Sequence, residues 1–378
     1  MKIALLVRIL WPAGTQKIAI MEAKTLTEMG HDVKLYFLRG TEKGRVYLDQ
    51  LKDINYEVLT WRNSSLLVPL YDFVTSIFMP SRKGEGRVDY NLIRKFPKII
   101  ENENFDLLIC HDQFSGLAGY YSKKKFNLDY IVYIHERLND YPWISGIFKR
   151  LIVRMAIKYQ SKILKSAHKV LGVTDKVAMT VSECYGVDAI GNLPGLTKHN
   201  RISYGDKRND IVSISYWSEV KKPLSYIPFI KELEGYRFLM LGSWISNNLK
   251  KSFIKELDNN KIMEKVILSE DVEEEEKYNF LGKAKFFLRF GFGEYGPSMG
   301  IIESLEAGTP VIINADIGIA DLIANKNLGH VIEFDKPDKL IHYLKNIDSE
   351  VPYYQLQKNI EEFIITHSWV NHCDKFFQ

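Results

Sequence analysis

The chain has 378 residues, of which 46% are hydrophobic and 26% are charged, and its formal net charge at pH 7 is +4. This length is too great for one hydrophobic core and suits two globular domains. No run approaches the roughly 20 consecutive apolar residues that a membrane-spanning helix requires. Cys110, Cys184 and Cys373 are widely spaced and odd in number, which argues against a disulfide framework or a zinc site. Arg8 interrupts the N-terminal apolar run, so we interpret this run as a strand rather than a secretion signal, and we expect a cytoplasmic protein.

Charge is distributed unevenly along the chain. Residues 1–200 contain 29 basic and 20 acidic side chains, a net charge of +9, whereas residues 201–378 contain 22 and 27, a net charge of −5. A basic half beside an acidic half indicates that only one of them meets an anionic surface or substrate. The alternative is drift in surface composition, and the sequence leaves both readings open.

Short apolar runs alternate with helical patterns along the whole chain. The first run is followed by a helical pattern at 15–29 that Gly30 ends, and then by a second run at 32–38. Such strand–helix–strand units build parallel sheets. The alternation restarts after Gly195, so the sequence predicts an α/β fold of two Rossmann-like domains, at 1–195 and 196–360, followed by a C-terminal helix at 361–378. Strands are predicted at 2–7, 32–38, 105–112, 130–136, 169–174, 210–215, 236–242, 265–270, 284–290 and 309–314.

Residues 284–323 are the most informative segment for function. A buried-type strand leads into a glycine-rich turn, Gly291–Gly296, after which Pro297 and Ser298 are expected to open a helix, with Ser298 able to cap it. Free backbone N–H groups at such a helix start form a natural diphosphate site. We expect this site at Ser298, Met299 and Gly300. Glu303 follows about one and a half turns later, where it could accept hydrogen bonds from the hydroxyls of a ribose.

This segment resembles the donor-site signature of the retaining family 4 glycosyltransferases. Glu303 followed by SLEAGTPVI matches the second glutamate of that signature and its sequel. The N-terminal residues 1–36 and the closing residues 367–377 resemble the ends of the same family. The resemblance implies a GT-B fold, with two facing Rossmann-like domains and a final helix that crosses back to the first. It also implies a nucleotide-sugar donor in the C-terminal domain, an acceptor in the N-terminal domain, and no metal or other cofactor.

The first glutamate of the signature is displaced in this sequence. Tyr295 lies eight positions before Glu303, where the family has a glutamate, and the acidic residue is Glu294, one position earlier. A one-residue insertion in the glycine turn would restore Glu294 to the donor-sugar site. The resemblance implies that Glu294 contacts the donor sugar and that Glu303 holds the ribose. The alternatives are a solvated loop charge for Glu294 and a lysine-paired helix carboxylate for Glu303.

Residues 215–227 occupy the place where the family has an arginine and, five residues later, a lysine on the donor diphosphate. Lys221 has the spacing of the lysine and Lys222 is next to it, but the arginine position is Tyr216. A lysine can act alone as a point charge on phosphate. We therefore expect Lys221 or Lys222 to bind the leaving diphosphate, with Lys222 assigned to catalysis, and a solvated turn is the alternative.

Three residues of the N-terminal half complete the candidates. His135 ends a predicted strand, and the resemblance implies a catalytic histidine near the transferred sugar at this place. His111 is a weaker candidate of the same kind, and both could instead be structural hydrogen-bonding residues. Gly14 lies in the first loop, where it would allow the backbone to approach a phosphate or an acceptor, or it is a plain turn glycine.

The segment 141–168 combines basic and apolar residues and contains no acid. A basic amphipathic helix of this kind can lie on an anionic membrane, such as the inner face of the cell membrane, and the alternative is a domain helix with a basic outer face. We do not expect nucleic-acid binding, because no known binding motif is present. The basic residues are Lys149, Arg150, Arg154, Lys158, Lys162 and Lys165.

The sequence therefore predicts a metal-independent glycosyltransferase that moves a sugar from a nucleotide-diphosphate-sugar to a glycan or lipid-linked acceptor with retention of configuration. Two alternatives stay open. One is a nucleotide-sugar epimerase of the same fold, which needs no acceptor. The other is a non-catalytic nucleotide-sugar-binding subunit, which the displaced Glu294 and the missing arginine at Tyr216 would explain.

Overall fold

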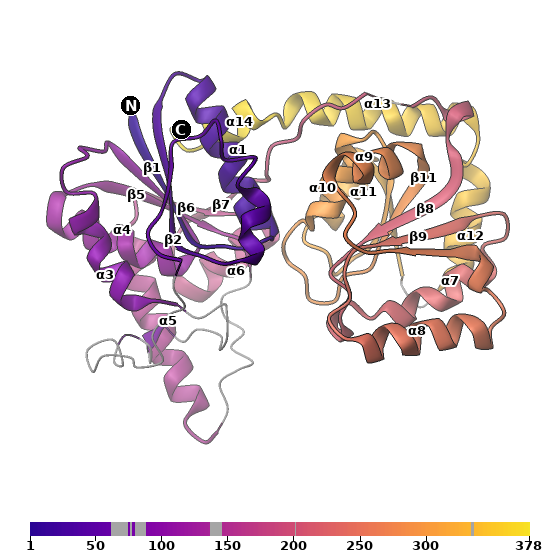
Figure 1. The fold of residues 1–378 in the computed structure, drawn as a ribbon, viewed down its shortest axis with the longest axis horizontal. Coiled ribbons are helices and arrows are strands. Elements are labelled where there is room, and N and C mark those ends of the chain that lie inside the picture. Colours follow the sequence, from indigo (N-terminus) through magenta and orange to yellow (C-terminus); the bar gives the residue numbers. More distant parts are fainter. Residues whose placement is uncertain (62–74, 76–77, 80–87, 137–145, 201, 334–335) are drawn as a thin grey trace. The chain divides into compact units, whose positions relative to one another are not determined.

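A computed structural model describes the chain except for residues 62–74, 76–77, 80–87, 137–145, 201 and 334–335. The chain forms two compact units (Figure 1). Unit 1 consists of Met1–Pro194 together with the C-terminal Trp369–Gln378, and unit 2 consists of Gly195–Ser368.

Unit 1 is built on a seven-stranded sheet with the strand order β3-β2-β1-β4-β5-β6-β7, in which all pairings are parallel. Figure 1 shows α1 with α14 on one side of this sheet and α3 with α4 on the other. The strands are β1 (Lys2–Leu10), β2 (Asp32–Gly40), β3 (Tyr56–Val58), β4 (Leu107–His111), β5 (Asp129–Ile134), β6 (Lys169–Gly172) and β7 (Ala189–Gly191). The helices are α1 (Gly14–Glu28), α3 (Tyr90–Ile99), α4 (Gln113–Phe126), α5 (Lys149–Ser166), α6 (Asp175–Tyr185) and α14 (Trp369–Asp374), with a 3-10 helix at Lys43–Tyr47.

Unit 2 is built on a six-stranded sheet with the order β10-β9-β8-β11-β12-β13, again with parallel pairings. Figure 1 shows α7 and α8 on one face of this sheet and α9, α10 and α11 on the other. The strands are β8 (Arg208–Ile214), β9 (Arg237–Leu241), β10 (Val266–Ser269), β11 (Ala284–Arg289), β12 (Val311–Asn314) and β13 (Gly329–Ile332). The helices are α7 (Ile227–Glu232), α8 (Asn247–Asn259), α9 (Glu274–Lys283), α10 (Met299–Glu306), α11 (Ala320–Lys326), α12 (Pro337–Ile347) and α13 (Glu350–Thr366), with 3-10 helices at Tyr204–Asp206, Glu219–Lys221, Pro223–Tyr226 and Met263–Lys265.

The ten strands predicted from the sequence are all present, and the prediction of an α/β fold with two parallel sheets is confirmed. The strands that the sequence did not predict are β3, β7 and β13, which are three or four residues long and lie at sheet edges. Such short edge strands pack on one side only, so they lack the long apolar run by which buried strands are recognised.

The predicted start of the C-terminal segment at residue 361 lies inside α13, which belongs to unit 2 up to its end. Tyr353, Ile360 and Phe363 of this helix are buried in unit 2, where the Tyr353 hydroxyl also donates to the backbone oxygen of Lys285 at 2.6 Å. The return to unit 1 therefore begins only at Trp369. There α14 packs against α1, with His372 and Cys373 buried.

Helix α4 approaches the sheet of unit 1 closely through a glycine. A Cβ atom at Gly119 would lie 2.5 Å from the ring of Tyr130 and 3.1 Å from the sulfur of Cys110, and both of these side chains are fully buried. The absence of a side chain at Gly119 thus sets the distance between α4 and strands β4 and β5. Strand β4 carries His111 at its end, so this packing also fixes the edge where the candidate histidines lie.

Substitution of Gly119 should test this packing. Gly119→Ala forces the buried Tyr130 to move, and we expect the free energy of unfolding to fall by about 1–3 kcal/mol in spite of the better helix propensity of alanine. Gly282→Ala is the matched control, because a Cβ at this second helical glycine would meet only Ile202, at an ordinary 3.5 Å. Urea unfolding of both variants measures the difference, and equal stability would contradict the packing argument.

Candidate functional site

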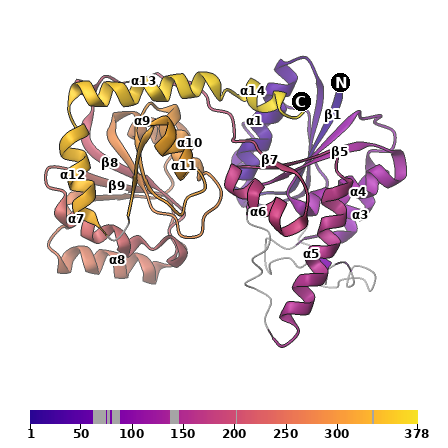
Figure 2. The same ribbon diagram turned by 180° about the vertical axis from the view of Figure 1, so that it is seen from behind.

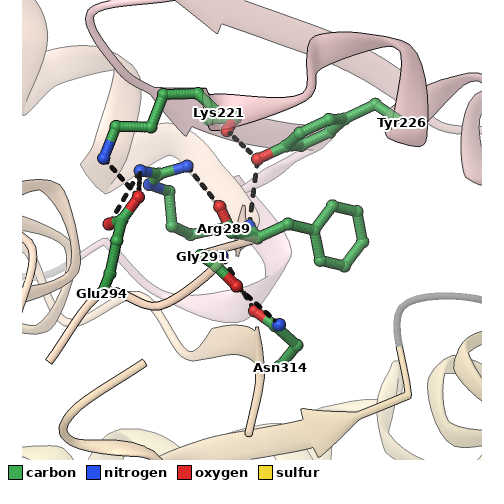
Figure 3. Close-up of polar contacts among 8 residues, drawn as sticks. Lys221, Tyr226, Arg289, Gly291, Glu294 and Asn314 are labelled. Atoms are coloured by element: carbon green, nitrogen blue, oxygen red, sulfur yellow. Dashed lines mark hydrogen bonds and ion pairs between the residues drawn. The ribbon is translucent and has the colours of Figure 1, made fainter. Parts of the chain in front are cut away.

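The glycine turn of unit 2 is fixed at its start by the side chain of Asn314, the last residue of β12. The backbone N–H of Gly291 donates to Asn314 Oδ1 at 2.8 Å, and Asn314 Nδ2 donates back to the Gly291 oxygen at 2.7 Å (Figure 3). The preceding N–H, of Phe290, donates to the hydroxyl of the fully buried Tyr226 at 3.1 Å. The chain therefore leaves β11 along a fixed path, although a glycine-rich segment has little preference of its own.

Two cations converge on Glu294 within this turn (Figure 3). Arg289, the last residue of β11, donates from Nη2 to both carboxylate oxygens at 2.9 and 3.0 Å. Lys221 forms an ion pair with the same carboxylate. The side chains of Arg289, Glu294 and Lys221 are 2%, 17% and 27% exposed. The cluster carries a net charge of +1, which suits a site for an anionic group.

Lys221 is a partly buried cation that lies close to a second cation, Arg289. Burial and the neighbouring Arg289 lower the pKa of Lys221, while Glu294 acts in the opposite direction. Burial penalises any charged side chain, and a second cation nearby adds to that cost. A bound anion would offset the lowering of the Lys221 pKa by burial and by Arg289, because it supplies further negative charge beside the two cations.

Lys222 reaches the same turn in another way. Its backbone is left-handed, with φ of 43°, immediately after the 3-10 helix that ends at Lys221. Its Nζ lies 4.0 Å from the centre of the Phe292 ring, a cation–π distance. The two neighbouring lysines therefore both contact the glycine turn, and they do so through different partners.

Helix α10 begins differently from the prediction. Pro297 lies outside the helix, which starts at Met299, and Ser298 is at the N-cap position but its side chain makes no capping hydrogen bond. Ser298 has φ of 60°, a conformation rarely adopted by a residue with a side chain, which is unlike the extended backbone of a usual serine cap. Gly300 allows α10 to approach the sheet, since a Cβ there would lie 3.2 Å from Phe287 and 3.4 Å from Ile214.

Glu303 is buried on α10, with 5% of its surface exposed. Lys277 of α9 donates to its carboxylate at 2.8 Å and also contacts Glu274 at 2.7 Å. The lysine-paired carboxylate that the sequence offered as an alternative is therefore present. Carboxylate oxygens accept hydrogen bonds from hydroxyl groups, so Glu303 has the chemistry that a ribose ligand requires.

The N-terminal candidates lie at the corresponding edge of the sheet in unit 1. His111 ends β4 and His135 follows β5, and their rings stack with centroids 5.2 Å apart. Nδ1 of His111 lies 3.1 Å from Nε2 of His135. Burial and the neighbouring His111 lower the pKa of His135 well below its ordinary value, so this ring is neutral at physiological pH. Gly14 is the first residue of α1, which follows β1.

Arg289, Lys277 and Asn314 contact the candidate residues but were not predicted from the sequence. Arg289 gave a signal that could have been used, because it is one of two charged residues, with Lys285, in a strand that is entirely buried. A buried charge requires a partner, and Glu294 is the acid that follows. Lys277 and Asn314 gave no comparable signal. Among the described residues, no group of three or more His, Cys, Asp or Glu side chains is arranged to hold a metal ion.

Comparison with known proteins agrees with this architecture. Residues 12–191 match the family model described as Glycosyltransferase Family 4. The fold is similar to that of HepE from Anabaena in complex with UDP, with a TM-score of 0.75, 13% identity, and coverage of 100% of this chain and 98% of HepE. It is also similar to a glycosyltransferase from Rickettsia africae, with a TM-score of 0.74, 18% identity, and coverage of 100% of this chain and 97% of that one. Sucrose-phosphate synthase from Thermosynechococcus elongatus is similar too, with a TM-score of 0.69, 12% identity, and coverage of 100% of this chain and 98% of that one. No curated protein sequence matches the chain.

The two parallel sheets with their helices are thus the two Rossmann-like domains of the GT-B fold. The match over residues 12–191 and this fold both agree with the resemblance to the family 4 glycosyltransferases. The family match covers unit 1 residues, whereas the signature that suggested the family lies in unit 2, so the two observations are independent.

The Asn314 contact can be tested directly. Asn314→Ala leaves the buried N–H and carbonyl of Gly291 without partners, and we expect a loss of about 2 kcal/mol in the free energy of unfolding. Asn346→Ala, on the exposed side of α12, is the control and should leave stability unchanged, since this side chain contacts only His342 on its own helix. Denaturant unfolding reports the difference. An unchanged stability of Asn314→Ala would show that the turn does not depend on this contact.

Proposed function

We propose that this glycosyltransferase moves a sugar from a nucleotide-diphosphate-sugar to a glycan or lipid-linked acceptor, with retention of configuration and without a metal ion. Donor binding is assigned to unit 2 and acceptor binding to unit 1. The observation that carries the proposal is the convergence of Lys221 and Arg289 on Glu294, in the glycine turn that leads into α10. This arrangement offers positive charge and backbone N–H groups to a diphosphate and a carboxylate to a sugar.

The roles follow from the chemistry of each group. Lys221, Lys222 and the N–H groups at Ser298, Met299 and Gly300 are assigned to the diphosphate, and Glu303 to the ribose hydroxyls. Glu294 is assigned to the donor sugar. Its displacement by one residue in the sequence is compatible with this role, because Arg289 holds its carboxylate at two points.

Transfer breaks the bond between the anomeric carbon and the phosphate oxygen and forms a bond to the acceptor oxygen. The negative charge that develops on the leaving diphosphate is the largest electrostatic demand of the reaction, and preorganised cations meet it at least cost. The acceptor hydroxyl must lose a proton, and we assign that proton to an oxygen of the leaving phosphate. His135 is assigned to the transferred sugar in unit 1.

Structures of HepE from Anabaena with UDP, with UDP and glucose, and with UDP-glucose make UDP-sugars the first donors to examine. A panel of nucleotide-sugars should be tested for binding, for hydrolysis, and for transfer in the presence of lipid extract. Interconversion of the free donor without an acceptor would identify an epimerase. Binding without turnover, even with lipid extract present, would identify a non-catalytic subunit.

Two substitutions in unit 2 test the assigned donor site. Lys221→Ala removes a charge from the diphosphate, and we expect kcat/KM for transfer to fall by an amount equivalent to about 1.5–3 kcal/mol, the scale of a hydrogen bond to a charged group. Glu303→Ala should weaken binding of the nucleoside diphosphate itself, as measured by calorimetry. Lys250→Ala, whose partner Glu270 lies outside the assigned contacts, is the control. Wild-type behaviour of both Lys221→Ala and Glu303→Ala would overturn the donor site.

A membrane surface is the proposed partner of helix α5. In both views α5 extends from unit 1 with its N-terminal end away from the sheet (Figures 1 and 2). Ile147, Phe148 and Leu151 at this end are 96%, 69% and 55% exposed. Across the part of the chain with described structure, none of the six basic side chains of α5 is ion-paired with a carboxylate. Exposed apolar residues beside cations that have no carboxylate partner are the features by which a helix lies on an anionic bilayer.

Within the described residues, no helix combines the length and the apolar composition that crossing a bilayer requires. The attachment that we propose for α5 is peripheral, on a cytoplasmic face that carries anionic lipid. Such attachment would bring unit 1 to a lipid-linked acceptor, and it agrees with the net charge of +9 over residues 1–200.

Sedimentation with lipid vesicles tests whether helix α5 binds an anionic membrane surface. We expect binding to vesicles that contain phosphatidylglycerol, weak binding to pure phosphatidylcholine, and release by salt. Ile147→Ser with Phe148→Ser, and separately Arg150→Gln with Arg154→Gln, should each reduce binding roughly tenfold or more. Val351→Ser is the control, because it removes an 80% exposed apolar residue from unit 2. Equal binding to both vesicle types, or an equal loss in the control, would refute the assignment.

A further inference from the structure

A chain of buried polar residues runs through unit 1 behind His135. Glu22 of α1 and His111 of β4 are both 0% exposed, and His372 of α14 is 3% exposed. The carboxylate oxygens of Glu22 lie 2.8 Å from His111 Nε2 and 2.8 Å from His372 Nε2. His111 in turn contacts His135, with Nδ1 of the first 3.1 Å from Nε2 of the second. One carboxylate thus links α14 to the strand-end histidines.

The charge states of this chain follow from its donors and acceptors. Burial alone would raise the pKa of Glu22, but its interactions with His111 and His372 lower the pKa to about 2, so the group is ionised and only accepts. Nε2 of His372 therefore donates to it. Nδ1 of His372 lies 2.8 Å from the backbone oxygen of Leu193, which also only accepts. Both ring nitrogens of His372 carry protons, so this residue is an imidazolium that balances the charge of Glu22.

Protonation of the other two rings is then determined in sequence. Nε2 of His111 lies 2.8 Å from an oxygen of Glu22 that only accepts, so this nitrogen is the one that carries a proton, and because His372 already balances Glu22 a single proton on His111 is sufficient. Its Nδ1 has a lone pair and accepts from Nε2 of His135. Since burial keeps His135 neutral, Nδ1 of His135 is left without a proton.

Other polar groups near the rings do not change this assignment. The Tyr133 ring contacts those of His111, His135 and His372, with centroids 4.5–5.7 Å apart, but its hydroxyl donates to the Asn192 oxygen at 2.5 Å. The other ring neighbours of His372 are Trp369 and Phe376. The proton position on His111 therefore depends on Glu22, and the proton position on His135 depends on His111.

We propose that Glu22, His111 and His372 are positioning residues that hold His135 as the neutral tautomer with the proton on Nε2 and the lone pair on Nδ1. This inference rests on the proposed function only in taking His135 as a substrate contact. An Nδ1 lone pair accepts a hydroxyl hydrogen and repels the oxygens of a phosphate, so His135 selects a sugar hydroxyl. The C-terminal residues that return to unit 1 contribute to this arrangement, because His372 of α14 is the cation that sets the tautomer of His135.

The charge balance predicts what removal of that cation does. In His372→Gln the negative charge of Glu22 is no longer compensated by an imidazolium, which favours a second proton on His111. His111 would then donate from Nδ1 to Nε2 of His135, and the proton of His135 would move to Nδ1. The acceptor that the sugar hydroxyl requires would be lost, although His135 itself is unchanged.

Nitrogen-15 NMR of protein labelled at histidine tests the proposal. In the wild type we expect His135 with a proton on Nε2 only and His372 with protons on both nitrogens at pH 7, with signals assigned by loss in His135→Gln and His372→Gln. In His372→Gln the His135 tautomer should reverse, and kcat for transfer should fall roughly tenfold or more while affinity for UDP is retained. His342→Gln, an exposed histidine of α12, is the control for loss of a histidine.

A His135 ring with its proton on Nδ1, a neutral His372, or an unchanged tautomer in His372→Gln would overturn the proposal. The wild-type spectrum, with the His135 signal assigned from His135→Gln, decides the first point even if His372→Gln fails to fold. The tautomers are measured without substrate, so a failure of the glycosyltransferase assignment would appear separately, as absence of donor binding with the predicted tautomers intact.

Discussion

Parallel pairing of the strands is the constraint on which the rest of this structure depends. All strand pairings in both sheets are parallel, so the carboxyl ends of the strands within each sheet meet at one edge. Residues that follow different strands become neighbours there, whatever their separation in sequence. In unit 2 this brings Arg289 and Asn314 to the same glycine turn, and in unit 1 it stacks His111 on His135.

Buried charged side chains are the second feature that the two sheets share at their carboxyl edges. Glu22, Glu294 and Glu303 are each largely removed from water, and each has one or two basic or imidazole partners. An isolated buried carboxylate would cost far more than folding can supply, so these partners are a condition of the fold as well as of the chemistry. The side chains are consequently held in defined positions, as a site for a charged donor requires. Helix α5 is the contrast, because its basic residues have no carboxylate partners among the described residues and are available to an external anion.

Much of the fold could be predicted from the sequence, since it depends on local patterns. Apolar segments of six to eight residues between helical patterns identified ten of the strands, and the glycine turn before Pro297 located the start of α10. The opening of that helix was wrong in detail, because Ser298 has a positive φ and its side chain makes no capping hydrogen bond. The boundary at residue 361 was also wrong. The contacts that retain α13 in unit 2, such as that between Tyr353 and Lys285, join residues far apart in the chain.

The sequence by itself determined where ten of the strands lie along the chain, the location of the glycine turn and the family that its residues resemble, because each of these depends on neighbouring residues. Only the tertiary structure decided which partners the charged residues have. Arg289 reaches Glu294 across five positions, but Lys221 reaches it across 73 and His372 reaches Glu22 across 350. Ion pairs and proton positions depend on distance through space and on exclusion of water, and neither quantity is present in a local pattern.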